Sequence, residues 1–196
     1  MHVVRKSSFT ATPWKNGGGI THEVMRVPAN GNSFRWRVSV AQIDASGPFS
    51  DFAEYNRKMV LLRGAGVRLT FDDGQPTYLR HVGDMAEFDG ALATRCELLD
   101  GPCADLNLMV SKTITDVRAW VERLPEPRSL RPSGTMLAFA ISGIVTLAIG
   151  NGESTDLHAW DLAVVSPGDR GAVSPASLDE CAAPLVFFAT LDDNSP

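Results

Sequence analysis

Residues 66–74, GVRLTFDDG, lead after a polar break into residues 83–90, GDMAEFDG, and the same arrangement recurs later in the chain. The second copy consists of residues 143–152, GIVTLAIGNG, followed by residues 160–168, WDLAVVSPG. In each copy a glycine precedes an alternating strand, a turn follows, and Asp-[Met/Leu]-Ala opens a second strand. Asp and Gly tolerate the positive φ angles that hairpin turns need. Because two copies are too few for a solenoid, the repeat predicts a duplicated β-barrel.

Period-two alternation extends the strand pattern beyond the repeat. In residues 34–40, FRWRVSV, four apolar side chains share one face, and Arg35, Arg37 and Ser39 share the other. Residues 117–124 fit both helical and strand spacing, and we expect a strand because the segment lies between two sheet-forming blocks. Many short strands with turns between them predict an all-β protein.

Strand pairs separated by glycine turns resemble the cupins. The expected fold is therefore a duplicated cupin (RmlC-like) double-stranded β-helix or jelly-roll barrel, a bicupin. We expect a larger N-terminal lobe with a ligand pocket at 1–122, a linker rich in proline and charge at 123–134, and a smaller lobe at 135–196. Metal-binding cupins carry a His-x-His pair, a Glu and a later His, and here the histidines are well separated: His2, His22, His81 and His158. A metal-dependent oxygenase is therefore not expected, and neither is a metal or another cofactor.

Composition excludes further classes. The 196 residues carry a formal net charge of −5, which provides no basic field for a polyanion, so nucleic acid is not an expected partner. No apolar run approaches the roughly 20 residues of a membrane helix, and none follows the N-terminus as a signal-peptide core would. Cys96, Cys103 and Cys181 have neither disulfide-framework nor zinc spacing, so we expect reduced thiols in a cytoplasmic protein.

The most unusual stretch is residues 12–23, TPWKNGGGITHE. Its three consecutive glycines can turn backbone N–H groups inward to form an anion-binding nest, with Lys15 adding charge and Trp14 an apolar wall. The alternative is a flexible glycine loop anchored by the Trp. The stretch lacks the spacing of a P-loop and the strand–turn–helix context of a dinucleotide fingerprint.

Polar residues elsewhere also leave two readings open. Arg37 and Ser39 either point to solvent or line the mouth of a ligand-holding barrel, where Arg suits a carboxylate because of its bidentate fork. Asp105, Asn107 and Met109 share one face of a predicted strand. An Asn side chain that points into a barrel needs hydrogen-bond partners. Asn107 therefore either forms hydrogen bonds that stabilise the fold or contacts a ligand.

Several motifs occurring in order resemble the HutD/Ves family of small bacterial bicupins. They are Trp14-Lys15-Asn16-Gly17-Gly18-Gly19-x-Thr21-x-Glu23, Trp36-Arg37-x-Ser39-x-Ala41, Gly47-Pro48-Phe49-Ser50-x-Phe52, Arg57, and Gly101-Pro102 with Asp105-x-Asn107-x-Met109. The resemblance is dense from about Trp14 to Met109 and only general beyond. It implies a pocket in the first barrel, and the expected ligand-binding residues are Trp14, Lys15, Asn16, Gly17, Gly18, Gly19, Thr21, Glu23, Arg37, Ser39, Phe49, Ser50, Arg57, Asn107 and Met109.

The resemblance also implies a role. HutD-type proteins are associated with histidine utilisation and are thought to sense a pathway intermediate, whereas Ves proteins are linked to cold and stress responses. The leading hypothesis is a metal-free protein that binds a small carboxylate such as urocanate or formylglutamate, without catalysis. The alternatives are a Ves-like stress protein, a metal-independent enzyme using Lys15, Glu23 or His22 as acid or base, and a protein-interaction module. A homodimer is a further expectation, because edge strands invite pairing.

Overall fold

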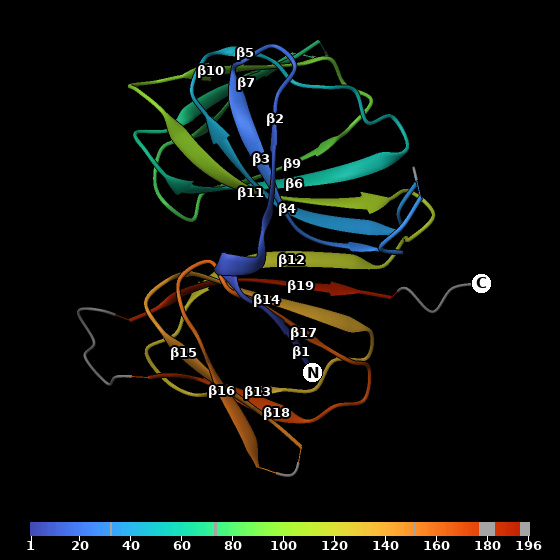
Figure 1. Cartoon of the computed structure of the whole chain (residues 1–196), viewed down its shortest axis with the longest axis vertical. Coiled ribbons are helices and arrows are strands. Elements are labelled where there is room, and N and C mark those ends of the chain that lie inside the picture. Colours follow the sequence, from blue (N-terminus) through green and yellow to red (C-terminus); the bar gives the residue numbers. More distant parts are fainter. Residues whose placement is uncertain (32, 73, 151, 177–182, 193–196) are drawn as a thin grey trace. The chain divides into compact units, whose positions relative to one another are not determined.

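The computed structural model describes residues 1–31, 33–72, 74–150, 152–176 and 183–192 (Figure 1). Strands dominate this part of the chain, together with a short 3-10 helix, η1 (Lys6–Ser8), and none of its helices is long and apolar enough to cross a membrane. Cys181 lies outside the described residues. Two compact units make up the chain, Phe9–Thr113 and Met1–Ser8 with Ile114–Pro196. The all-β class is confirmed.

Phe9–Thr113, the N-terminal unit, contains two antiparallel sheets. The six-stranded sheet has the order β2-β3-β4-β11-β6-β9, with bounds Thr10–Pro13, Gly19–Val27, Trp36–Ile43, Cys103–Ser111, Tyr55–Arg63 and Met85–Asp89. The four-stranded sheet has the order β5-β10-β7-β8, with bounds Gly47–Pro48, Thr94–Leu98, Val67–Phe71 and Thr77–Leu79. Apolar side chains from both sheets form one core: Ile43, Met59, Leu61, Val67, Leu69, Leu79, Ala86, Phe88, Cys96 and Cys103.

The second unit, here called the C-terminal unit, repeats this plan on a smaller scale. Its five-stranded sheet has the order β1-β17-β14-β19-β12, with bounds His2–Val4, Leu162–Val165, Thr135–Ser142, Leu185–Leu191 and Val117–Arg123. Its four-stranded sheet has the order β13-β18-β15-β16, with bounds Arg128–Leu130, Gly171–Pro175, Val145–Ile149 and Glu153–Leu157. The strand expected from residue 117 is confirmed as β12, and β7, β9, β15 and β17 confirm the duplicated motif.

The expected lobe boundaries differ from these units. The segment expected to be a linker contains β13, which pairs with β18, and β12 pairs with β19 over its whole length. At the other end of the chain, β1 pairs with β17. Pairing of backbone groups therefore assigns residues 1–8 and 114–134 to the C-terminal unit, because a strand belongs to the sheet that satisfies its hydrogen bonds.

The inner faces of two central strands of the N-terminal unit, β4 and β6, change from polar to apolar along their length. On β4 the alternate positions run from Arg37 through Ser39 and Ala41 to Ile43, of which Ile43 belongs to the core. On β6 they run from Arg57 to Met59 and Leu61, which also belong to the core. The space between the two sheets is therefore packed at one end and lined by polar groups at the other.

Candidate functional site

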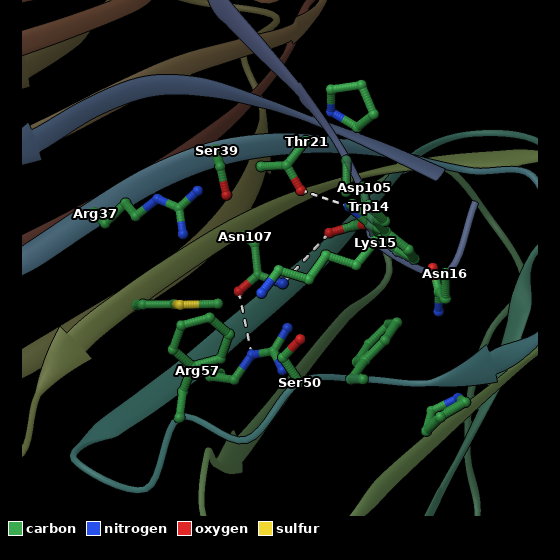
Figure 2. A pocket seen from close by; sticks show the side chains of 16 residues that line it. Trp14, Lys15, Asn16, Thr21, Arg37, Ser39, Ser50, Arg57, Asp105 and Asn107 are labelled. Carbon is green, nitrogen blue, oxygen red and sulfur yellow. Dashed lines mark hydrogen bonds between the residues drawn. The ribbon is translucent and has the colours of Figure 1, made fainter. Parts of the chain in front are cut away.

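A cavity of about 550 Å³ occupies the polar end of the N-terminal unit (Figure 2). Its walls come from β3, β4, β6 and β11 and from the segments 13–16 and 48–52. The residues that line it are Pro13, Trp14, Lys15, Asn16, Thr21, Arg37, Ser39, Ala41, Pro48, Phe49, Ser50, Phe52, Arg57, Asp105, Asn107 and Met109. Sites for small molecules have volumes of this order.

Sheet register sets the polar wall of the cavity. Met109 on β11 pairs with Arg37 on β4 and with Arg57 on β6, so the two arginines lie in one row across three strands. Two residues before Met109 on β11, Asn107 pairs with Ser39 of β4. Two residues before Asn107, Asp105 pairs with Ala41 of β4. Because residues two apart in a strand share a face, these rows present their side chains to the same space.

Arg57 is the most enclosed cation of the cavity, with 5% of its surface exposed. Its guanidinium lies 5.0 Å from the ring centroid of Phe49, 5.7 Å from that of Phe52 and 5.0 Å from that of Phe88. Burial is the main reason why the pKa of Arg57 falls to about 10, and the neighbouring Arg37 lowers it further while Asp105 opposes the fall. The group therefore stays charged at neutral pH in an apolar setting that strengthens its attraction for an anion.

Asp105 is the buried acid of the cavity, with 1% of its surface exposed. Asn107 links it to Arg57, because Asn107 Nδ2 donates to Asp105 Oδ1 at 3.5 Å and Arg57 Nε donates to Asn107 Oδ1 at 3.4 Å (Figure 2). Burial raises the pKa of Asp105 to about 7, against the lowering effects of Arg57 and of the hydrogen bond from Asn107. The cavity thus contains a carboxyl group that changes charge near neutral pH.

The raised pKa of Asp105 predicts a specific pH dependence of stability. The pKa of an Asp side chain in an unfolded chain is about 3.9, whereas the pKa of Asp105 in the folded chain is about 7. Between these values the folded chain holds a proton that the unfolded chain has lost, so the free energy of unfolding falls as pH rises and levels off above about 7. Asp105→Asn removes this component, because the amide does not ionise. Chemical denaturation at pH 5 and pH 8 should show the variant gaining stability relative to wild type at the higher pH. The exposed Asp44→Asn variant is the control, and equal pH slopes for Asp105→Asn and wild type would contradict the assignment.

Residues 14–19 form a self-bonded loop at the cavity. Gly17 N donates to Trp14 O at 3.0 Å, Gly18 N donates to Asn16 Oδ1 at 3.0 Å, and Trp14 N donates to Gly19 O at 2.9 Å. Two of the three glycine N–H groups are therefore occupied within the loop, and none of the glycines lines the cavity. Of the two alternatives for this stretch, these hydrogen bonds favour a glycine loop anchored by Trp14 over an anion nest. The glycines instead shape the loop, since Gly17 has a φ of 71°.

The same loop presents one aromatic side chain, Trp14, and one charged side chain, Lys15, to the cavity. Trp14 Nε1 donates to Thr21 Oγ1 at 2.8 Å, and the Trp14 ring meets Phe49 edge-on with centroids 6.4 Å apart. Lys15, which is exposed, lines the cavity from the same loop. The loop therefore supplies an apolar wall and one cation at the cavity entrance.

Comparison with known proteins shows the family to which the chain belongs. The sequence model of the HutD family matches residues 6–182. The chain belongs to the HutD family. That family is associated with histidine utilisation, and an uncharacterized 21.2 kDa protein in the hutC 3′ region of Pseudomonas putida is 35% identical over 163 residues, which are 82% of this chain and 84% of that protein. Protein Ves of Escherichia fergusonii is 32% identical over 97 residues, 49% of this chain and 50% of that protein.

Solved structures agree with this relationship. HutD from Pseudomonas fluorescens SBW25 has a TM-score of 0.78 at 29% identity, covering 97% of this chain and 98% of that one. An oxalate decarboxylase from Lactobacillus farciminis has a TM-score of 0.72 at 9% identity over 98% of this chain and 86% of that one, which shows a shared fold. The resemblance to HutD and the cupin fold are therefore confirmed.

Most of the residues expected at a HutD-type pocket meet in the cavity. These are Trp14, Lys15, Asn16, Thr21, Arg37, Ser39, Phe49, Ser50, Arg57, Asn107 and Met109. Glu23 lies outside the lining and contacts it through Arg37. The expectation missed five lining residues, Pro13, Ala41, Pro48, Phe52 and Asp105. Asp105 could have been found, because it alternates with Asn107 and Met109 on one strand face.

The donor set of this HutD cavity does not fit a metal ion. Its lining includes one carboxylate, Asp105, and neither a histidine nor a cysteine. In the described parts of the chain, no group of three or more His, Cys, Asp or Glu side chains could hold a metal. The side chains of His81 and His158 are 84% and 64% exposed. We therefore derive no chemistry through a metal here.

The corresponding interior of the C-terminal unit is filled by apolar side chains. Met136, Ala138 and Ala140 on β14 face this core together with Val186 and Phe188 on β19. Each of these residues is at most 5% exposed. The polar cavity between the two sheets of the N-terminal unit therefore corresponds, in the C-terminal unit, to a part of the interior that is packed with apolar side chains.

Proposed function

We propose that this HutD family member binds a small carboxylate in the N-terminal cavity and regulates histidine utilisation by sensing a pathway intermediate, such as urocanate or formylglutamate. The observation that supports this most is the row formed by Arg37 and Arg57 on either side of Met109, with Asn107 beside them. Two guanidinium groups in one cavity provide forked donors that match carboxylate oxygens.

Charge within the cavity favours an anion. Arg37, Arg57 and Lys15 contribute three cations to the lining, while Asp105 is the acidic residue of the lining, and burial raises its pKa to about 7. Trp14 and Phe49 cover part of the wall with rings, which keeps water out and strengthens the polar contacts. A ligand that combines carboxylate groups with a small planar or extended body matches this lining.

Thermal unfolding against histidine-pathway intermediates and glutamate analogues tests the proposal. A ligand at 100 times its dissociation constant stabilises the folded chain by about 2.7 kcal/mol, which raises Tm measurably. We expect one carboxylate to raise Tm in wild type and to lose this effect in Arg37→Ala, because a charge pair in the cavity loses a partner. Arg80→Ala removes an exposed arginine of the same unit that stacks on Tyr78, and it should respond like wild type.

The outcome separates the remaining hypotheses. If no compound of the panel raises Tm, histidine-pathway sensing is contradicted and a Ves-like or partner-binding role gains weight. An enzyme is favoured by one observation, the pKa of about 7 of buried Asp105, which suits an acid or base. His22 does not line the cavity. Incubating each stabilising compound with the chain and measuring its chemical conversion distinguishes an enzyme from a binding protein.

Homodimer formation and a cytoplasmic location stay predictions.

A further inference from the structure

Glu23 holds one of the cavity arginines from outside the cavity. It lies on β3, where it pairs with Ser39 of β4, and its Oε2 is 2.9 Å from Nε of Arg37. The Glu23 side chain is 34% exposed and the Arg37 side chain 18% exposed. Arg37 lines the cavity and Glu23 does not, so the carboxylate of Glu23 stands at the rim.

The contact between Glu23 and Arg37 is an ion pair without a directed hydrogen bond. Arg37 Nε is buried and has no hydrogen-bond partner among the described residues, although Glu23 Oε2 is close to it. A buried donor without a partner lowers stability, whereas a partly exposed ion pair contributes little to it. An acceptor placed in line with the guanidinium N–H groups would therefore bind Arg37 better than Glu23 does.

We propose that Glu23 is an internal competitor that a ligand carboxylate must displace from Arg37, and that it thereby sets the affinity of the site. This inference rests on the proposed function, since it assumes that the ligand is a carboxylate bound through Arg37. Glu23 neutralises Arg37 and leaves its Nε–H without a directed hydrogen bond. The arriving carboxylate provides that hydrogen bond, and Glu23, already one-third exposed, returns to water.

Binding of glutarate to purified full-length chains tests this competition. Glu23→Gln keeps the length of the side chain and removes its charge, so we expect glutarate to bind up to about fivefold more tightly. Glu87→Gln removes the same charge from the same unit at a residue that pairs with Lys58 and does not line the cavity, and its affinity should stay within about twofold of wild type. In the Arg37→Ala background, Glu23→Gln should give no gain.

A second measurement needs no ligand. Phenylglyoxal modifies guanidinium groups, and peptide mass spectrometry reports its rate at Arg37. Loss of the Glu23 charge should speed this modification in Glu23→Gln and leave it unchanged in Glu87→Gln.

The two readouts separate the possible failures. If wild type binds glutarate and Glu23→Gln binds it equally or more weakly, Glu23 positions Arg37 instead of competing for it, and the inference is overturned. An unchanged modification rate overturns it as well. If no chain binds any carboxylate while Arg37 modification accelerates in Glu23→Gln, the ion pair is present but the proposed function fails, and the competition fails with it.

Discussion

Arg57→Met is expected to reduce affinity for the carboxylate by about two orders of magnitude or more while leaving the free energy of unfolding unchanged or higher. The loss of affinity follows because removing one partner of a buried charge pair costs about 2–5 kcal/mol. Stability is kept because the buried guanidinium, whose pKa falls to about 10 through burial, no longer has to be desolvated on folding, and this gain offsets the loss of its hydrogen bond to Asn107 and of its attraction to Asp105. The thioether packs against the three phenylalanine rings that now surround the guanidinium. Titration calorimetry and chemical denaturation of the same samples measure both quantities.

Lys58→Met is the matched control for Arg57→Met. Lys58 is the next residue of β6, it is also largely buried, and its Nζ lies 2.7 Å from Glu87 Oε2. Neighbouring residues of a strand face opposite sides, and Lys58 does not line the cavity. The control therefore removes one cation from the same strand and should bind the ligand as wild type does. Ligand binding by Arg57→Met within about threefold of wild type would show that Arg57 has a structural role.

Gly19→Ala is expected to destabilise the chain by about 3 kcal/mol, which lowers Tm by roughly 10 °C. A Cβ at this position would lie 2.2 Å from the backbone oxygen of Gln42 and 3.2 Å from Cε3 of Trp14. Backbone atoms cannot rotate away, so the start of β3 must separate from the end of β4. Trp14 would move with it, because Trp14 N donates to Gly19 O. Thermal unfolding measures the loss.

Gly47→Ala is the control for this substitution. A Cβ at Gly47 has no atom within 4 Å, so we expect a change within about 0.5 kcal/mol. If Gly19→Ala unfolds at the same temperature as Gly47→Ala, the close approach of β3 and β4 is not needed for stability. Gly17, Gly18 and Gly19 would then be needed only for the conformation of the loop.

Strand alternation predicted much of this fold because its physical cause is local. Successive side chains of a strand point to opposite faces, so the apolar positions of residues 34–40 and of the repeated glycine–strand units show in the sequence where strands lie. The segment from residue 117 needed context, since its spacing fits a helix as well. Backbone pairing with β19 settles it as strand β12.

Unit boundaries could not be obtained in the same way. The proline-rich residues 123–134 have the composition of a linker, yet β13 within them pairs with β18. Residues 2–4 belong to the C-terminal unit because β1 pairs with β17. These pairings join segments that are far apart in the sequence, and no local pattern records them.

In the candidate site, too, some features could be predicted from the sequence and others depended on long-range contacts. The resemblance to HutD indicated eleven of its lining residues, yet it also included Gly17, Gly18 and Gly19, whose place in the loop depends on hydrogen bonds within it. Asp105 was missed although it alternates with Asn107 and Met109, because its burial beside the cavity arginines depends on the tertiary structure. Its surroundings raise its pKa to about 7.

Alternation, glycine turns and ordered motifs are properties of short segments, so they were enough to predict the strands, the duplication and the family. The tertiary structure was needed to add Asp105 to the pocket of Arg37, Arg57 and Asn107, since the register of β4, β11 and β6 aligns these side chains. It also decided that Glu23 stands outside that cavity and that the second barrel is filled with apolar side chains. Burial and charge proximity arise only when distant strands pair, and these two quantities control the chemistry of the site.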